Sequence, residues 1–212
     1  MRLITLLTTL LLITSVSAAP AAPVTEAISD LQHQWAVINY QTEKDKQEQR
    51  FEVLADSAHE VSARYPHSAE PLVWEAIILS SYAGAKGGLG ALSLVKQARE
   101  LLLKAEEIDP STLSGSIYTS LGSLYYQVPG WPLSFGDDDK ARAYLEKALT
   151  INPDGIDPNY FYGDFLIEEG EYERATEVLK KALAAPQRAN RPIADTGRKQ
   201  EINAALLRAS KG

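Results

Sequence analysis

The chain has 212 residues, of which 45% are hydrophobic and 23% charged, a balance that is ordinary for a globular protein. With 21 Lys and Arg against 28 Asp and Glu, its net charge of −7 argues against binding to nucleic acid or to an anionic membrane surface. The absence of Cys excludes disulfides, cysteine nucleophiles and thiolate metal ligands.

The N-terminus has the pattern of an export signal. Arg2 gives a basic start, residues 3–16 are mainly apolar, and the run ends with small residues up to Ala18. We therefore predict a signal peptide over residues 1–18, cleaved near Ala18, and a periplasmic location. The alternative is an uncleaved membrane anchor. Because the fourteen residues of the apolar run fall short of the roughly twenty that span a bilayer, we expect no stable membrane insertion after cleavage.

A repeat organises the rest of the chain. Three segments place Ala, Leu, Ala and Pro at intervals of four, three and five residues, with the last Pro one place early. The residues are Ala98, Leu102, Ala105 and Pro110; Ala141, Leu145, Ala148 and Pro153; and Ala175, Leu179, Ala182 and Pro186. Such spacing marks one face of a helix, on which Ala lets a neighbouring helix approach closely, and Pro ends the helix. Another apolar helical pattern precedes each segment, so the predicted unit is a helical hairpin.

These hairpins resemble the tetratricopeptide repeat (TPR), a unit of about 34 residues with Leu-Gly and Tyr on its first helix and Ala, Leu, Ala and Pro on its second. Tyr118, Leu121, Gly122 and Tyr125 match the first helix, and Gly163, Gly170 and Tyr172 are in register in the last unit. The resemblance implies an all-α fold, a right-handed α-solenoid of about 3.5 to 4 hairpins. The expected units are a degenerate hairpin at 24–66, repeats within 69–186 (69–110, 112–153 and 157–186), and a capping helix at 193–210. A closed helical bundle is the alternative.

Two insertions between helices depart from the family pattern. Residues 84–90 hold four glycines and one Lys, and we expect a long flexible turn there, with an anion-binding nest as the alternative. Residues 128–136 hold two prolines, so we expect a packed loop, in which Trp131 and Phe135 either cover the groove between hairpins or form a rim that grips a ligand. The three aspartates at 137–139 are interpreted as a helix start rather than a calcium site, because the alternating oxygen ligands of a calcium loop are missing.

The resemblance also predicts where a ligand would bind, because the first helices of TPR arrays line an inner groove. Carried over by register, the expected binding residues are Glu75, Leu79, Tyr82, Thr119, Ser123, Tyr126, Tyr160, Asp164 and Ile167, with Trp131 at the rim. They include no basic clamp for a terminal carboxylate, so a C-terminal peptide is not expected as the ligand.

Catalysis finds no support in the sequence. The three histidines, His33, His59 and His67, form no metal-ligand pair at helical spacing and accompany no nucleophile motif, so we predict no catalytic residue, no metal and no cofactor. The expected function is that of a non-catalytic periplasmic interaction module that binds a segment of another envelope protein in its groove. Alternatively, the insertions resemble the T component of TRAP transporters, which implies a small-molecule solute and a solute-binding protein as partner.

Overall fold

The computed structural model describes residues 24–212, which are almost entirely helical. The predicted signal peptide at 1–18 lies outside the described residues. The described residues form nine α-helices: α1 (Val24–Gln41), α2 (Lys44–Arg64), α3 (Ala69–Lys86), α4 (Gly88–Ile108), α5 (Ser116–Gln127), α6 (Asp138–Ile151), α7 (Ile156–Glu168), α8 (Tyr172–Leu183) and α9 (Pro192–Ala209). None of these helices is both long enough and apolar enough to cross a membrane.

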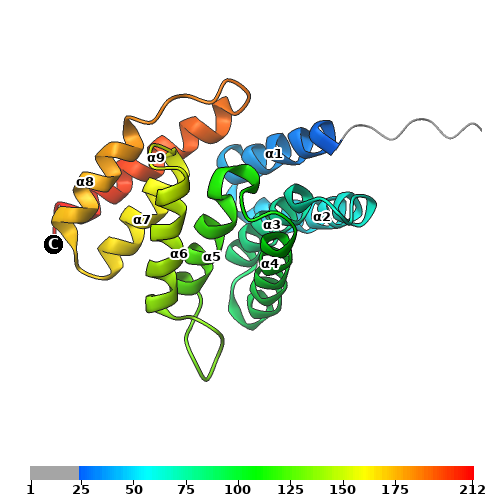
Figure 1. Ribbon diagram of the computed structural model, residues 1–212, viewed down its shortest axis with the longest axis horizontal. Helices are drawn as coiled ribbons and strands as arrows, with labels where there is room; N and C mark the ends of the chain where they lie inside the picture. Colours follow the sequence, from blue (N-terminus) through cyan, green and yellow to red (C-terminus); the bar gives the residue numbers. More distant parts are fainter. Residues whose placement is uncertain (1–23) are drawn as a thin grey trace, which may run out of the picture.

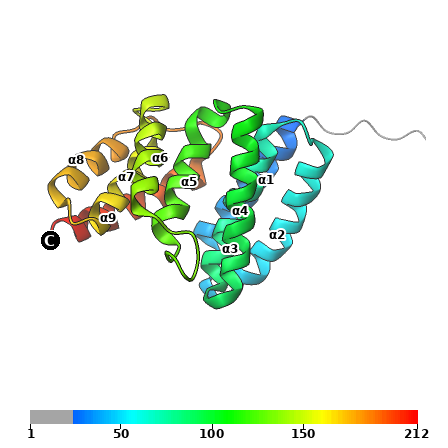
Figure 2. The same cartoon turned by 60° about the horizontal axis from the view of Figure 1, so that its bottom comes forward.

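The helices pack as four hairpins and a final helix, and Figure 1 shows them following one another along an arc. Each odd-numbered helix pairs with the even-numbered helix after it and also contacts the next odd-numbered helix, from α1 through α3, α5 and α7 to α9. The last helix, α9, lies against both α7 and α8. Figure 2 shows the same succession from a second direction. The all-α fold of stacked hairpins with a C-terminal helix is thus confirmed.

The seams between paired helices depend on the Ala and Leu positions of the repeat. Ala141, Leu145 and the corresponding residues of α4 and α8 are fully buried. Opposite them, a Cβ atom added to Gly122 would lie 2.5 Å from Cγ of Leu145, and one added to Gly163 would lie 2.6 Å from Cγ of Leu179. The Leu side chain therefore occupies the space that the missing side chain leaves, and the two helices of the hairpin come close together.

The inserted residues at 84–90 lengthen helices instead of forming a loop. Helix α3 continues to Lys86 and α4 begins at Gly88, so that Gly87, with φ of 65°, alone joins them. The expectation of a long flexible turn is wrong. Gly87 and Gly88 both have positive φ, 65° and 59°, which glycine adopts readily, and this short reversal replaces the expected loop. The other inserted residues belong to α3 or α4.

The arc of helices curls until its two ends meet. Helix α9 contacts α1, and the hydroxyl of Tyr40 on α1 donates a hydrogen bond to Oε2 of Glu201 on α9 at 3.1 Å. Figure 1 shows the start of α9 reaching back toward α1. The inner face is therefore closed over at this point, and it does not run as an open trough along the whole array.

Candidate functional site: a pocket inside the curled array

The contact between α9 and α1 leaves a pocket of about 950 Å³ on the inner face of the array. All five odd-numbered helices contribute to its wall, together with parts of α2 and α4 and the loops before α6 and α9. Most of the wall is apolar, and small polar side chains such as Ser120 and Ser123 of α5 are interspersed in it. A mainly apolar cavity with a few convergent polar groups has the usual composition of a ligand pocket.

Two tryptophans from neighbouring first helices form one side of the pocket. The rings of Trp35 and Trp74 meet edge to face with centroids 6.0 Å apart, and both side chains are almost fully buried. Nε1 of Trp35 donates a hydrogen bond to Oγ of Ser81 at 2.8 Å. Nε1 of Trp74 is buried and has no hydrogen-bond partner in the described part of the chain. Because a buried indole N–H normally has an acceptor, this donor is an unusual feature of the wall.

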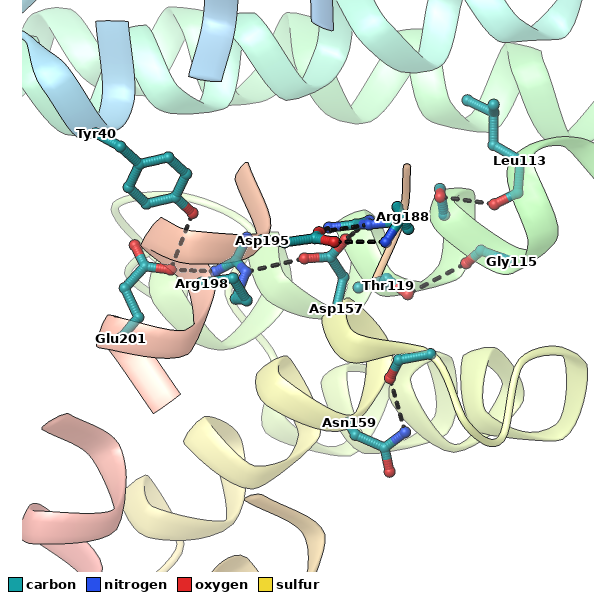
Figure 3. Close-up of polar contacts among 12 residues, drawn as sticks. Tyr40, Leu113, Gly115, Thr119, Asp157, Asn159, Arg188, Asp195, Arg198 and Glu201 are labelled. Atoms are coloured by element: carbon teal, nitrogen blue, oxygen red, sulfur yellow. Dashed lines mark hydrogen bonds and ion pairs between the residues drawn. The ribbon is translucent and has the colours of Figure 1, made fainter. Parts of the chain in front are cut away.

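A network of ion pairs closes the ring of helices, and Figure 3 shows its members converging from α1, α7, α9 and the segment before α9. Arg198 donates from Nη1 to Oε2 of Glu201 at 2.7 Å and from Nε to Oδ1 of Asp157 at 2.9 Å. Arg188 donates from Nη1 to Oδ2 of Asp157 at 2.7 Å. We call Tyr40, Asp157, Arg188, Asp195, Arg198 and Glu201 the closing network.

Among the carboxylates of the closing network, Asp157 is kept charged by the arginines around it. Burial alone would raise the pKa of Asp157, but the charges of Arg198 and Arg188 outweigh it and hold that pKa well below its usual range. Asp195, whose side chain is 2% exposed, accepts a hydrogen bond from Nε of Arg188 at 2.7 Å. Arg188 and Arg198 are therefore both neutralised by neighbouring carboxylates.

Arg191 lies in the same segment but contacts aromatic rings instead. Cζ of its guanidinium lies over the ring of Trp74, 4.9 Å from the centroid, and 5.9 Å from the centroid of Trp35. Within residues 24–212 it forms no ion pair, and its buried Nε has no hydrogen-bond partner. Burial lowers the pKa of Arg191, and the charges of Arg188 and Arg198 add to this effect against the opposing attraction of Asp157 and Asp195.

Two of the residues that the family register predicted for ligand binding line the pocket, Thr119 and Ser123. Glu75 and Tyr82 instead contact α2: Glu75 accepts hydrogen bonds from Ser62 and from Nδ1 of His59, and Tyr82 donates to Glu52 at 3.1 Å. The remaining aliphatic residues of the set, Leu79 and Ile167, are more than 90% buried.

The other predicted residues lie mostly in the seam between α5, α7 and α9. Tyr126 donates a hydrogen bond to Oδ2 of Asp164 at 2.8 Å, and Asp164 also pairs with Arg208 of α9. The ring of Tyr160 lies 4.4 Å from Cζ of Arg198. Their roles in ligand binding stay a prediction, although Tyr126 and Asp164 already have hydrogen-bond or ion-pair partners within the seam.

The loop before α6 is packed at one of its two aromatic residues. Phe135 meets the ring of Tyr125 edge to face with centroids 5.4 Å apart, and the guanidinium of Arg99 lies over it at 4.4 Å. Trp131, by contrast, is 89% exposed and covers no groove. At the end of the loop, Oδ1 of Asp137 accepts a hydrogen bond from the backbone N–H of Lys140 at 3.0 Å, which confirms the predicted helix start.

Sequence reasoning missed the charge of the inner face. The register positions of the first helices include no basic residue, whereas Arg188, Arg191 and Arg198, from outside that register, line the pocket. The three arginines come from the segment before α9 and from α9 itself, which the register of first helices did not include. The clustering of Arg between residues 188 and 198 was the only sequence feature that could have indicated them.

Comparison with known proteins gives a family match over part of the chain and a similar solved structure. A family model described as tetratricopeptide repeat matches residues 133–192, which run from the loop before α6 to the start of α9. Among solved structures, the chain is similar to TTC0263, a thermophilic TPR protein in Thermus thermophilus, with 15% sequence identity and a TM-score of 0.45, covering 87% of this chain and 100% of that one. No curated protein matches the chain significantly.

Proposed function

Since this chain is a tetratricopeptide repeat protein, we propose that it is a non-catalytic binding module whose inner pocket holds a compact ligand. Tetratricopeptide repeats are generally protein–protein interaction modules. The observation that carries our proposal is the contact of α9 with α1, which leaves a partly enclosed pocket of about 950 Å³. Pockets for small ligands have volumes of about 300–1,000 Å³ and mainly apolar walls with a few polar groups.

An extended peptide along the whole inner face fits the geometry less well. Such a peptide needs free side chains on successive first helices, whereas Glu75, Tyr126 and Asp164 have hydrogen-bond partners on neighbouring helices. The favoured occupant is therefore a small molecule or a similarly compact group. This is the small-solute alternative that the likeness to the T component of TRAP transporters implies.

The tryptophans of the chain offer a direct test. The variant Trp131→Phe removes the exposed tryptophan and leaves Trp35 and Trp74, which both line the pocket. The apolar dye N-phenyl-1-naphthylamine accepts energy from tryptophan, so its binding in the pocket quenches the emission of these two residues. We expect saturable quenching with one dye per chain, which the pocket-filling change Ser120→Phe abolishes. Dye binding that Ser120→Phe leaves unchanged would contradict the proposal.

A second candidate function, docking of a partner protein, is favoured by the loop before α6. Trp131 and Leu133 are 89% and 63% exposed, and tryptophan is enriched at protein interfaces. We propose another periplasmic or envelope protein as this partner. A photo-crosslinking residue at Trp131 should give one recurring protein adduct in cells, while the same residue at Val53, an apolar residue of α2 that is 63% exposed, should not. Equal adducts at both positions would speak against a specific interface.

The proposed periplasmic location is supported by the sequence of residues 1–18. If the signal peptide is cleaved after Ala18, mass spectrometry of the protein from a periplasmic extract should give an N-terminus at Ala19. An intact N-terminus on protein found only in the cytosolic fraction would contradict both the cleavage and the location.

A further inference from the structure

We propose that the pocket recognises a small organic acid, whose carboxylate pairs with Arg191 and whose flat apolar body lies against the tryptophans of the wall. This inference rests on the proposed function and adds the chemical class of the ligand. It depends on three observations: the unequal pairing of the arginines, two buried hydrogen-bond donors, and the composition of the remaining wall.

The arginines of the pocket differ in whether the protein itself neutralises them. Arg188 has Asp157 and Asp195 as partners, and Arg198 has Asp157 and Glu201. Arg191, between them in the chain, has no ion pair within residues 24–212. A buried charge is unfavourable unless it is paired, so Arg191 is where an anion from outside would gain most.

Two hydrogen-bond donors on the same part of the wall point to an acceptor. Nε of Arg191 and Nε1 of Trp74 are both buried without a partner among the described residues, and Trp74 as a whole is 3% exposed. A buried donor left unsatisfied costs about 1–3 kcal/mol, so this part of the wall favours a nearby acceptor. A guanidinium presents its N–H donors as a planar fork, and a planar carboxylate matches that geometry.

The rest of the pocket indicates what the carboxylate is attached to. A volume of about 950 Å³ greatly exceeds that of a single inorganic anion, and the wall beyond Arg191 includes Trp35, Phe161 and Val95. Aromatic walls favour flat apolar groups that stack on or against the rings. The net charge of the chain is −7, so the positive charge at Arg191 is a local feature and does not reflect an overall attraction for anions.

The test compares two dyes that share the 1-anilinonaphthalene skeleton: 1-anilinonaphthalene-8-sulfonate, in which a sulfonate stands in for the carboxylate, and the neutral N-phenyl-1-naphthylamine. We expect wild-type protein to bind the anionic dye at least tenfold more tightly than the neutral one. In Arg191→Met the affinity for the anionic dye should fall at least tenfold, while that for the neutral dye changes less than twofold. The control Arg50→Met removes the same charge from an exposed position on α2 and should change neither affinity.

A second measurement needs no variant and therefore does not depend on how Arg191→Met folds. 3-Phenylpropanoate should displace the anionic dye from the wild-type protein, and 3-phenylpropanamide should do so at least tenfold less well. Equal displacement by acid and amide, or equal weakening of both dyes by Arg191→Met, would overturn the inference. If neither dye binds to the wild-type protein, the proposed function itself fails. If only the neutral dye binds, the proposed ligand-binding function is upheld, but the inference that the ligand is an anion is wrong.

Discussion

The substitution Asp157→Asn removes the charge on which two arginines of the closing network depend while it keeps the size of the side chain. Each oxygen of Asp157 accepts one hydrogen bond, from Nε of Arg198 at 2.9 Å and from Nη1 of Arg188 at 2.7 Å. An amide has a single acceptor oxygen and presents donors to the other guanidinium. Removing one partner of a buried ion pair costs about 3–5 kcal/mol, and because Asp157 is 26% exposed in its side chain we expect about 3 kcal/mol.

Thermal unfolding near neutral pH, followed by circular dichroism, measures this loss. For a chain of this length about 1 kcal/mol corresponds to about 2–4 °C in Tm, so Asp157→Asn should lower Tm by about 6–12 °C. Asp154→Asn is the matched control, because Asp154 is 76% exposed and pairs at 3.2 Å with Lys181 on the surface. A surface pair contributes about 0–1 kcal/mol, so Tm of the control should fall by at most about 4 °C.

The effect of pH on the Tm difference between wild type and Asp157→Asn tests whether the charge of Asp157 is the cause. Because the arginines hold the pKa of Asp157 well below its usual range, its contribution to stability is complete above the pKa of an unfolded Asp, about 3.9, and is lost as the pH falls toward the folded-state pKa. The difference in Tm between wild type and Asp157→Asn should therefore narrow as the pH is lowered from about 5 to about 2. A variant as stable as the wild type near neutral pH, or a difference that stays constant in acid, would refute the reasoning.

Three further substitutions test single features of the repeat by chemical denaturation. Ala141→Leu adds volume at a fully buried position, so the free energy of unfolding should fall by about 1–3 kcal/mol, and an unchanged value would contradict the seam. Asp137→Ala removes the side-chain cap of α6 and should lower the free energy of unfolding by about 1 kcal/mol. Asp137→Asn keeps a capping oxygen, so a stability equal to that of the wild type would attribute the loss in Asp137→Ala to the cap. Gly170→Ala adds a Cβ with no atom within 4 Å at φ of 78°, so a cost of about 1 kcal/mol would be purely conformational, and no cost would refute the backbone argument.

The hairpins could be predicted from sequence because their determinants are local. Ala141, Leu145 and Ala148 are one helical turn apart, and their spacing alone identifies the face that a partner helix covers. Gly122 marks the complementary position on the first helix, where any side chain would meet Leu145. Each signal lies within a few residues and repeats along the chain, so the architecture follows from it.

The 84–90 segment shows how a local signal can mislead. Glycines are unfavourable in helices, and four of them within seven residues indicated a loop. In the structure, α3 nevertheless continues to Lys86 and α4 begins at Gly88, and the two helices are in extensive contact. Burial of long helices against each other outweighs a few unfavourable propensities of about 1 kcal/mol each.

The pocket could not be predicted in the same way because it depends on contacts between distant parts of the chain. Tyr40 and Glu201 are 161 residues apart, and nothing in the spacing of a repeat states how far the array curls. Arg188 and Arg191 lie between α8 and α9, in a segment without helical periodicity, so no register could assign them to the inner face. Their position follows only once α9 is placed against α1.

The closing network positions Arg191 through the short segment before α9. Buried ion pairs add little net stability compared with apolar contacts, but they are demanding in geometry, since a shifted register leaves charges buried without partners. Arg188 and Arg198 are both anchored to Asp157, so the backbone between them has fixed ends. Arg191 lies within this anchored stretch, and its guanidinium is thereby held over Trp74 in advance of any ligand. A side chain that is already in place loses less conformational entropy on binding, so the network that closes the ring also prepares Arg191 for an anion.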